Sequence, residues 1–291
     1  MTQFGRGPFS GRGTGRGGGG GRGINPRLII AGVVALFAIV SFFSMRQINP
    51  ITGKVQHVSM SPQDEIALGL QAMPEMMQMH GGEDRDSADQ RLVDAIGAEL
   101  LRAIPNGENN PYQFEFHLLA DPQTINAFAL PGGQVFITRA LFDKLQTEGQ
   151  LAGVLAHEVG HVIERHGAQR MAKMGLTQGL VGAVAVGASD SQVGAQQAAQ
   201  LANAVAQLVN LKYGREDELE SDTWGVILAA NAGYDPRAMI GVMDILEDAS
   251  AGGQKPPEFM STHPSHGNRV ERIKSAIETY FPDGLPSGLR P

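Results

Sequence analysis

Residues 151–166 have the sequence LAGVLAHEVGHVIERH, which contains an H-E-x-x-H motif at His157, Glu158 and His161. A cap at Thr147 and regularly spaced apolar residues predict that this stretch is a helix. Residues four apart lie on one face of a helix, so the two imidazoles can converge on one metal ion. Zinc binds histidine nitrogen at about 2.0–2.1 Å, and Glu158 is offset by one position, where it can reach a water on the ion. The motif therefore predicts a zinc site with a carboxylate beside it.

A third protein ligand must come from elsewhere, because a catalytic zinc site combines three protein ligands with one open position. The sequence contains no cysteine, which excludes thiolate ligands, disulfides, iron–sulfur clusters and cysteine nucleophiles. His166 is nine residues beyond His157, which predicts that it points away from the ion on the opposite side of the same helix. A carboxylate on another helix is thus the expected third ligand.

The densest group of acidic residues is the stretch 214–222, GREDELESD. Glu218 and Asp222 are four residues apart and share a helix face. In this pairing Glu218 would bind the ion, and Asp222 would accept a hydrogen bond from the outer nitrogen of a ligand histidine. Glu216 and Glu220 have the same spacing, so periodicity alone does not choose between the two pairs.

Several blocks of the sequence, taken in order, resemble the gluzincin zinc metallopeptidases of the HtpX, BepA and CAAX-prenyl-protease type. The similarity extends over about residues 61–277 and includes NAFALPGGQVFITRAL at 126–141, the motif block at 151–166, YGREDELESDTWG at 213–225, AGYDP at 232–236, and THP at 262–264 followed by Arg269. Ser221 stands where alanine is usual. The resemblance implies a zincin-like domain with one zinc ion per subunit, Glu218 as the third ligand and Asp222 as the partner of a ligand histidine.

The resemblance also implies the reaction, which is hydrolysis of peptide bonds. Zinc would lower the pKa of a water molecule and polarise the peptide carbonyl, while Glu158 would take a proton from the water and pass it to the leaving amine. An extended substrate would pair with an edge strand that precedes the metal helix. The substrate-strand residues implied by the resemblance are Ala127, Phe128, Gly132, Gly133 and Phe136. A simple turn explains Pro131-Gly132-Gly133 equally well.

His263 is open to three interpretations. In BepA-like relatives a histidine at this position can approach the zinc and restrain activity. Alternatively, His263 could donate a hydrogen bond to the developing oxyanion. It could also be a loop histidine before Pro264 that takes no part in the reaction.

Outside the motif, the sequence predicts an α+β fold that is mainly helical and has one small β-sheet. Alternating apolar residues predict strands at 114–119, 125–130 and 134–138. Amphipathic patterns predict helices at 61–79 and 89–104, and helices through most of the second half.

A stripe of small residues is expected on one of the later helices. Gly175, Gly179, Ala183 and Gly187 recur every four residues, and small residues on one face let helices approach closely. The purely apolar part of this helix, 180–188, is too short to span a bilayer. We therefore expect the stripe to pack inside the domain rather than against a membrane.

An uninterrupted apolar segment, LIIAGVVALFAIVSFFSM, extends from Leu28 to Met45. As a helix it would be roughly 27 Å long, close to the thickness of the bilayer core. Arg27 and Arg46 flank it. Soluble helices are rarely apolar on every face, and a cleavable signal peptide would need a small-residue cleavage site, which is missing near Ser44. The segment therefore predicts one uncleaved transmembrane helix.

The 291 residues carry a formal net charge of −7, but this charge is unevenly distributed. Residues 1–27 contain five of the 23 basic residues and none of the 30 acidic ones, so the remainder carries 18 basic and 30 acidic groups, a net charge of −12. Eleven of the 38 glycines lie in residues 1–23, which predicts a disordered tail. The arginines before the apolar segment predict a cytoplasmic tail and a periplasmic catalytic domain. The Arg-Gly pattern supports nucleic-acid binding only weakly, and with an acidic remainder we expect none.

Together these features predict a single-pass protein of a bacterial inner membrane. Its expected segments are a tail at 1–27, an anchor at 28–45, a linker at 46–60, a zinc metallopeptidase domain at 61–280 and a C-terminal tail at 281–291. The expected function is zinc-dependent cleavage of proteins or peptides, and the resemblance implies a role in envelope protein quality control. The alternative is a membrane-tethered chaperone or adaptor that binds zinc without cleaving protein.

Overall fold

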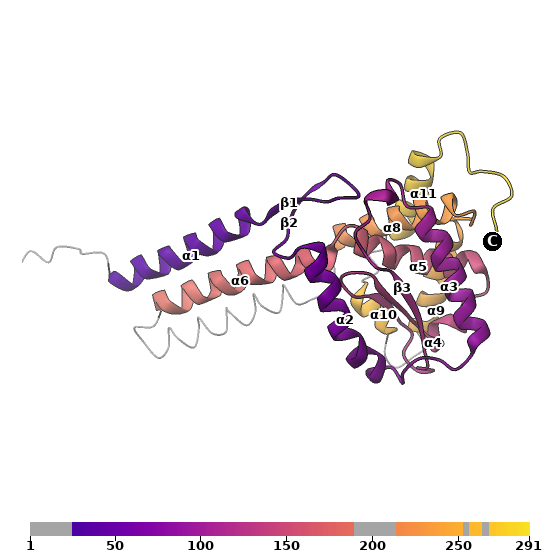
Figure 1. The fold of residues 1–291 in the computed structure, drawn as a ribbon, viewed down its shortest axis with the longest axis horizontal. Coiled ribbons are helices and arrows are strands. Elements are labelled where there is room, and N and C mark those ends of the chain that lie inside the picture. Colours follow the sequence, from indigo (N-terminus) through magenta and orange to yellow (C-terminus); the bar gives the residue numbers. More distant parts are fainter. Residues whose placement is uncertain (1–24, 189–213, 253–255, 264–267) are drawn as a thin grey trace, which may run out of the picture.

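The structure is a computed structural model and describes residues 25–188, 214–252, 256–263 and 268–291 (Figure 1). Its main elements are α1 (Pro26–Ser44), β1 (Arg46–Ile48), β2 (Val55–His57), α2 (Pro62–Met79), α3 (Ser87–Arg102), β3 (Glu115–Leu119), β4 (Ala127–Ala129), β5 (Gln134–Thr138), α4 (Arg139–Phe142), α5 (Glu148–Ile163), α6 (His166–Ala188), α8 (Arg215–Asn231), α9 (Ala238–Gly252), α10 (Glu258–Thr262) and α11 (Arg269–Tyr280). The fold is α+β and mainly helical, as predicted. Residues 1–24 of the predicted tail, and Pro264, lie outside the described residues.

Helix α5, which carries the motif, lies at the centre of the globular part. Every residue from Gly149 to Ile163 is buried. Helices α3, α8 and α9 and strand β4 pack around it. Gly160 allows α8 to come close, since a β-carbon there would lie 2.8 Å from Cβ of Trp224 and 3.2 Å from Cα of Ser221. The two helices therefore meet at the level of the motif.

The main sheet has three strands in the order β3-β5-β4. Strand β3 is parallel to β5, whereas β4 is antiparallel to β5 and forms an edge. The turn between β4 and β5 contains Gly132 and Gly133, whose φ angles are +88° and +117°. A β-carbon at Gly132 would lie 2.3 Å from Cα of Ile66 on α2, so glycine is required both for conformation and for space.

The stretch 46–60, expected to be a linker, contains the two-stranded hairpin β1–β2. This hairpin is fixed to the end of α5: Asn49 Nδ2 donates to the carbonyl oxygen of Ile163 at 2.7 Å, and Gln56 Nε2 donates to that of Glu164 at 2.8 Å. The segment that follows α1 is therefore attached to the motif helix.

Helices α1 and α6 lie side by side, run in opposite directions and project together from the globular part (Figure 1). Helix α1 begins at Pro26, earlier than the predicted Leu28, because Asn25 caps it and proline fits the first turn. Of the described helices, α1 is the one long and apolar enough to cross a membrane.

The small-residue stripe on α6 does not pack inside the domain as expected. A β-carbon at Gly179 would lie 2.6 Å from Cβ of Ala38, so the close approach is to α1, outside the globular part. The expectation was wrong because the length of the apolar run does not reveal which helix lies beside it.

Candidate metal centre and active site

Four side chains from separate elements converge in the interior. His157 and His161 come from α5, Glu218 from α8, and His263 from the residue after α10. One donor atom of each lies within 4.8 Å of those of the other three. The Nε2 atoms of His157 and His161 are 3.1 Å apart, and the Glu218 carboxylate oxygens lie 3.5 and 3.6 Å from them. None of the four side chains is more than 3% exposed.

These residues fit a metal ion of the zinc type. Both carboxylate oxygens of Glu218 are buried, and neither has a hydrogen-bond partner among the described residues. A buried carboxylate without such a partner is costly, and a cation at the centre of the group would satisfy it. Two imidazoles and one carboxylate form a usual ligand set for catalytic zinc.

A buried pair of charges orients the first histidine of the motif. Asp222 Oδ1 lies 3.0 Å from Nδ1 of His157, and Arg269 Nε donates to Asp222 Oδ2 at 2.8 Å. Burial alone would raise the pKa of Asp222, but the charge of Arg269 holds the pKa well below its usual range. The carboxylate therefore stays charged, and it leaves Nε2 of His157 directed at the donor group.

The electrostatic environment of His157 favours a positive charge. Burial alone would lower its pKa, but the hydrogen bond with Asp222 and the nearby carboxylate of Glu218 outweigh this effect and raise the pKa to about 9. The same two carboxylates would stabilise a metal cation at this place, opposed by Arg269, whose Nη1 lies 3.4 Å from Glu218.

Glu158 lies beside the donors without being one of them. It is buried, and its Oε1 lies 3.6 Å from Nε2 of His263. Burial raises the pKa of Glu158 to about 7, an effect opposed by the charge of His157 and strengthened by Glu218. A carboxylate whose pKa is near neutrality can both take and return a proton, which general acid–base catalysis requires.

His166 lies against His161, so the prediction that it points elsewhere was wrong. Helix α5 ends at Ile163, Arg165 adopts a left-handed φ of +57°, and α6 begins at His166. This turn brings Nδ1 of His166 to 2.9 Å from Nδ1 of His161. The spacing argument failed because it assumed one continuous helix through a residue, Arg165, that gives no sequence signal for a stop.

The alternative acidic pair does not reach the donor group. Glu216 is exposed, and Glu220 Oε2 lies 3.1 Å from Nε2 of His166. Of the two pairs that spacing left open, the structure thus brings Glu218 and Asp222 to the histidines, while Glu220 contacts the outer partner of one of them.

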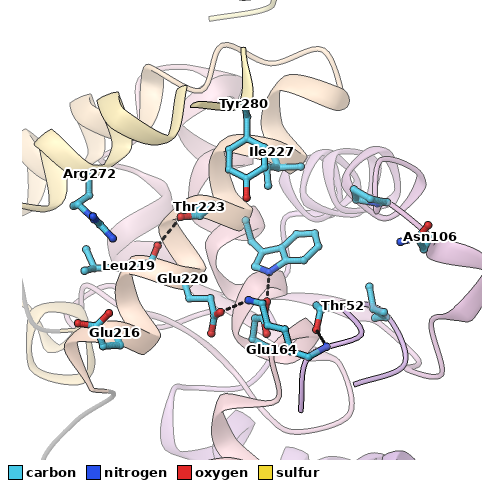
Figure 2. Close-up of a pocket in the computed structure, with 14 residues that line it drawn as sticks. Thr52, Asn106, Glu164, Glu216, Leu219, Glu220, Thr223, Ile227, Arg272 and Tyr280 are labelled. Atoms are coloured by element: carbon cyan, nitrogen blue, oxygen red, sulfur yellow. Dashed lines mark hydrogen bonds and ion pairs between the residues drawn. The ribbon is translucent and has the colours of Figure 1, made fainter. Parts of the chain in front are cut away.

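A cavity of about 570 Å³ has Glu164 and Glu220 among its lining residues (Figure 2). Glu164 is buried there and accepts hydrogen bonds from Lys54 Nζ and Trp224 Nε1, both at 2.7 Å. Lys54 also pairs with Glu220. None of the four donor residues lines this cavity, so it is not the space in which the donor group would meet a substrate.

Only part of the predicted substrate strand lies at the edge of the sheet. Phe136 lies on the central strand β5 and is fully buried. The carbonyl oxygens of Gly132 and Gly133 accept hydrogen bonds from Gln113 and Glu115, as in an ordinary turn. These three residues therefore cannot pair with a substrate, because their backbone or side chains are already engaged.

Strand β4 is an outer strand of the sheet and contacts α5, which carries two of the donor residues. Leu130 N donates to the carbonyl oxygen of Gln134, and Thr138 N donates to that of Asn126. Because hydrogen-bonded positions alternate along an antiparallel pair, the backbone groups of Ala127 and Ala129 point away from β5. The backbone of Ala129 is close enough to the Glu158 carboxylate to favour its charged form, which opposes the rise of its pKa. Of the predicted residues, Ala127 and Phe128 thus belong to an edge strand next to Glu158.

The contact of Arg269 with the acidic residues of the site was not predicted from the sequence. This residue belongs to the resemblance, but no role followed from the sequence, because it lies 47 positions from Asp222. A buried arginine that faces two acids cannot be inferred from local periodicity.

The sequence model of peptidase family M48 matches residues 87–277, which include all four donor residues, Glu158, Asp222 and Arg269. The chain belongs to peptidase family M48. This confirms the resemblance deduced from the motif blocks.

Individual M48 relatives cover the same region. The beta-barrel assembly-enhancing protease of Yersinia pestis is 35% identical over 201 residues, which are 67% of this chain and 40% of that protein. The corresponding protein of Escherichia coli K12 is 31% identical over 199 residues, 67% of this chain and 40% of that protein. The mitochondrial metalloendopeptidase OMA1 of Schizosaccharomyces pombe is 29% identical over 235 residues, 81% of this chain and 67% of that protein. The chain thus spans less than half of the length of both bacterial relatives.

Proposed function

We propose that this M48 chain is a zinc-dependent endopeptidase that is anchored in a bacterial inner membrane by α1, with its N-terminus in the cytoplasm and its catalytic domain in the periplasm. The observation that carries the proposal is the burial of Glu158 beside His157, His161 and Glu218. The relatives are named as proteases, and the exposed apolar surface of α1 supports the anchor.

His157, His161 and Glu218 would hold the ion, and a bound zinc supplies the Lewis acidity that activates water and polarises a peptide carbonyl. Glu158 accepts the proton of the attacking water and delivers it to the nitrogen of the leaving amine. Asp222 keeps His157 oriented through its Nδ1.

For the substrate, we propose an extended segment of polypeptide that pairs with the edge of β4. The outward backbone groups of Ala127 and Ala129 support this mode of binding, since β-augmentation uses main-chain hydrogen bonds. The name of the bacterial relatives, beta-barrel assembly-enhancing protease, supports quality control of envelope proteins as the biological role.

His263 is proposed to restrain this activity by occupying the open side of the donor group. Its ring lies 5.3 Å from that of His157 and 5.0 Å from that of His161, and it stacks on Phe259 at 4.5 Å. The variant His263→Ala should then retain zinc and cleave protein faster than the wild type. A loss of cleavage with zinc retained would instead support the oxyanion role.

The central test compares Glu158→Gln with the wild type, both as full-length protein in lipid nanodiscs. Zinc content and cleavage of casein are measured. Because Glu158 is not a ligand, the variant should keep its zinc while cleavage falls by about 10²–10⁴-fold, the usual contribution of a general base. Glu218→Gln should lose zinc and cleavage together.

Glu216→Gln is the matched control, because Glu216 is an exposed acid on the same helix as Glu218. It should equal the wild type in both measurements. If the wild type binds zinc but cleaves no better than Glu158→Gln, the proposal fails in favour of the zinc-binding adaptor. A wild type without zinc would contradict both functions.

A further inference from the structure

We propose that α6 enters the membrane beside α1, so that this chain is held by two membrane-embedded helices rather than one. The inference rests on the proposed anchoring by α1. It concerns a helix whose apolar run, taken alone, is too short to span a bilayer.

The first support is the packing of the two helices. Their antiparallel arrangement is visible in Figure 1, and Gly179 on α6 faces Ala38 on α1. Ala183, which lies one turn further from the globular part, is buried. Small residues at such a contact let helix backbones approach closely, which is the usual way in which membrane helices associate.

The second support is the register of the charges. On α1, Ser44 lies six residues closer to the globular part than Ala38. Because α6 runs in the opposite direction, the position that matches Ser44 is Lys173, six residues before Gly179. Lys173 is therefore level with Ser44, the last residue of α1, and Arg46 follows two positions later in the chain. Beyond Lys173, residues 174–188 contain no aspartate, glutamate, lysine, arginine or histidine. The uncharged part of α6 thus lies beside the apolar segment of α1.

The third support is the exposure of apolar side chains. Val184 is 47% and Val186 is 36% exposed on α6, and Val33 is 60% exposed on α1. In the part of the chain that the structure describes, 12 of the 17 exposed large apolar side chains lie on these two helices. So many exposed apolar side chains on two packed helices are unfavourable in water and suit the acyl chains of lipid.

The polar residues of this part of α6 are compatible with that environment. Thr177 Oγ1 donates to the carbonyl oxygen of Lys173 at 2.9 Å, so its hydroxyl is satisfied within the helix. Gln178 is polar but carries no charge. At 1.5 Å per residue, the 15 residues from 174 to 188 extend about 22 Å, enough to pass the middle of the bilayer core without crossing it.

The insertion of α6 has a consequence for the metal centre. Only Glu164 and Arg165 separate α5 from α6, and the first residue of α6 is His166, which contacts His161. The helix that carries two of the donor residues is therefore joined to the proposed membrane segment of α6 by the ten residues 164–173.

The chain contains no cysteine, so single cysteines can report the depth of each helix. Val33 is five residues from Ala38, and Val184 is five residues from Gly179 in the matching direction, which places both at the same depth. Val33→Cys, Val184→Cys and the exposed domain control Glu271→Cys are labelled with an NBD fluorophore. Full-length proteins are reconstituted in phosphatidylcholine–phosphatidylglycerol vesicles that contain doxyl-labelled lipid.

We expect the lipid quencher to reduce fluorescence at Val184→Cys and at Val33→Cys to a comparable extent, with no loss at Glu271→Cys. Quenching at Val33→Cys alone would overturn the insertion of α6 and leave the anchor intact. No quenching at either position would contradict the anchor itself. If labelled Val184→Cys is unquenched and the unlabelled variant, treated with an added oxidant, forms a disulfide between two copies, another copy of the chain covers α6, which also overturns the proposal. Casein cleavage equal to that of the cysteine-free protein shows that each variant is folded.

Discussion

Helices α5 and α1 are both rich in apolar residues, yet protein covers α5 and leaves most of α1 exposed. Helix α5 is buried from Gly149 to Ile163, whereas Ala38 is the one buried residue of α1. A helix that is apolar all round must be covered either by protein or by lipid. The comparison teaches that polar residues decide between coverage by protein and coverage by lipid. The histidines of α5 have buried partners on other helices, whereas α1 has no ionisable residue after Arg27.

The two regions also differ in what holds them together. Around α5, buried ions are paired over long distances in the sequence, as in the contact of Arg269 with Asp222. Between α1 and α6, close contact depends on small residues such as Gly179. Substitutions should therefore act through charge and tight packing in the first region and have weak effects at open positions of the second.

The largest expected effect is that of Arg269→Met. Removing this arginine leaves Asp222 and Glu218 buried without their counter-ion, so the free energy of unfolding should fall by about 3–5 kcal/mol. Urea unfolding of the full-length protein, followed by the fluorescence of the single tryptophan Trp224, measures it. A chelator keeps metal binding from contributing.

The matched control is Arg237→Met, because Arg237 also pairs with an aspartate but its side chain is 67% exposed. Its effect should stay below about 1 kcal/mol. Equal effects of the two variants would contradict the view that buried ion pairs distinguish the region around α5.

An intermediate effect is expected from Gly160→Ala. The added methyl group would meet Trp224 and Ser221 where α5 and α8 touch, so the free energy of unfolding should fall by about 1–3 kcal/mol. On α6, Gly182→Ala meets no atom within 4 Å, and alanine favours helix by up to about 1 kcal/mol. Thermal unfolding by circular dichroism should thus show a lower midpoint for Gly160→Ala only. A comparable loss for Gly182→Ala would indicate an unrecognised contact on α6.

The smallest expected effect concerns the stability of the protein at acidic pH. The hydrogen bond from Arg139 holds the pKa of Asp84 below its usual value. Asp84 therefore contributes stability that is fully present above the unfolded pKa, near pH 4, and is lost as the pH falls through the folded pKa. Between pH 5 and 3, the free energy of unfolding of Arg139→Gln should decline less than that of the wild type, and the two declines should differ by about 0.5–1 kcal/mol.

Lys274→Gln is the control for this prediction, since Lys274 pairs with Glu271 on the exposed surface of α11. Its acid dependence should match that of the wild type. The free energy of unfolding is measured by urea unfolding at each pH. If it changes with pH to the same extent in all three proteins, the role of Arg139 is refuted. Residues 174–188 of α6 contain no group that titrates, so acid should act on the globular part.

Much of the candidate site could be predicted from the sequence because its information is local. The four-residue spacing of His157 and His161 is a helical repeat, and it places both imidazoles together in any context. The choice of Glu218 over Glu216 came from the resemblance, since both acids have the same periodicity. The edge position of β4 required the order of the strands, and this order also removed Phe136 from the predicted substrate strand.

By itself, the sequence determined the motif helix, with His157, Glu158 and His161 on it, and the apolar segment at the N-terminus. Only the tertiary structure decided that His166 turns back to His161, that Arg269 pairs with Asp222, and that α6 lies along α1. The physical reason is the same in each case. Local periodicity fixes which residues share a face, whereas the direction of the chain after a turn, here at Arg165, fixes what that face meets.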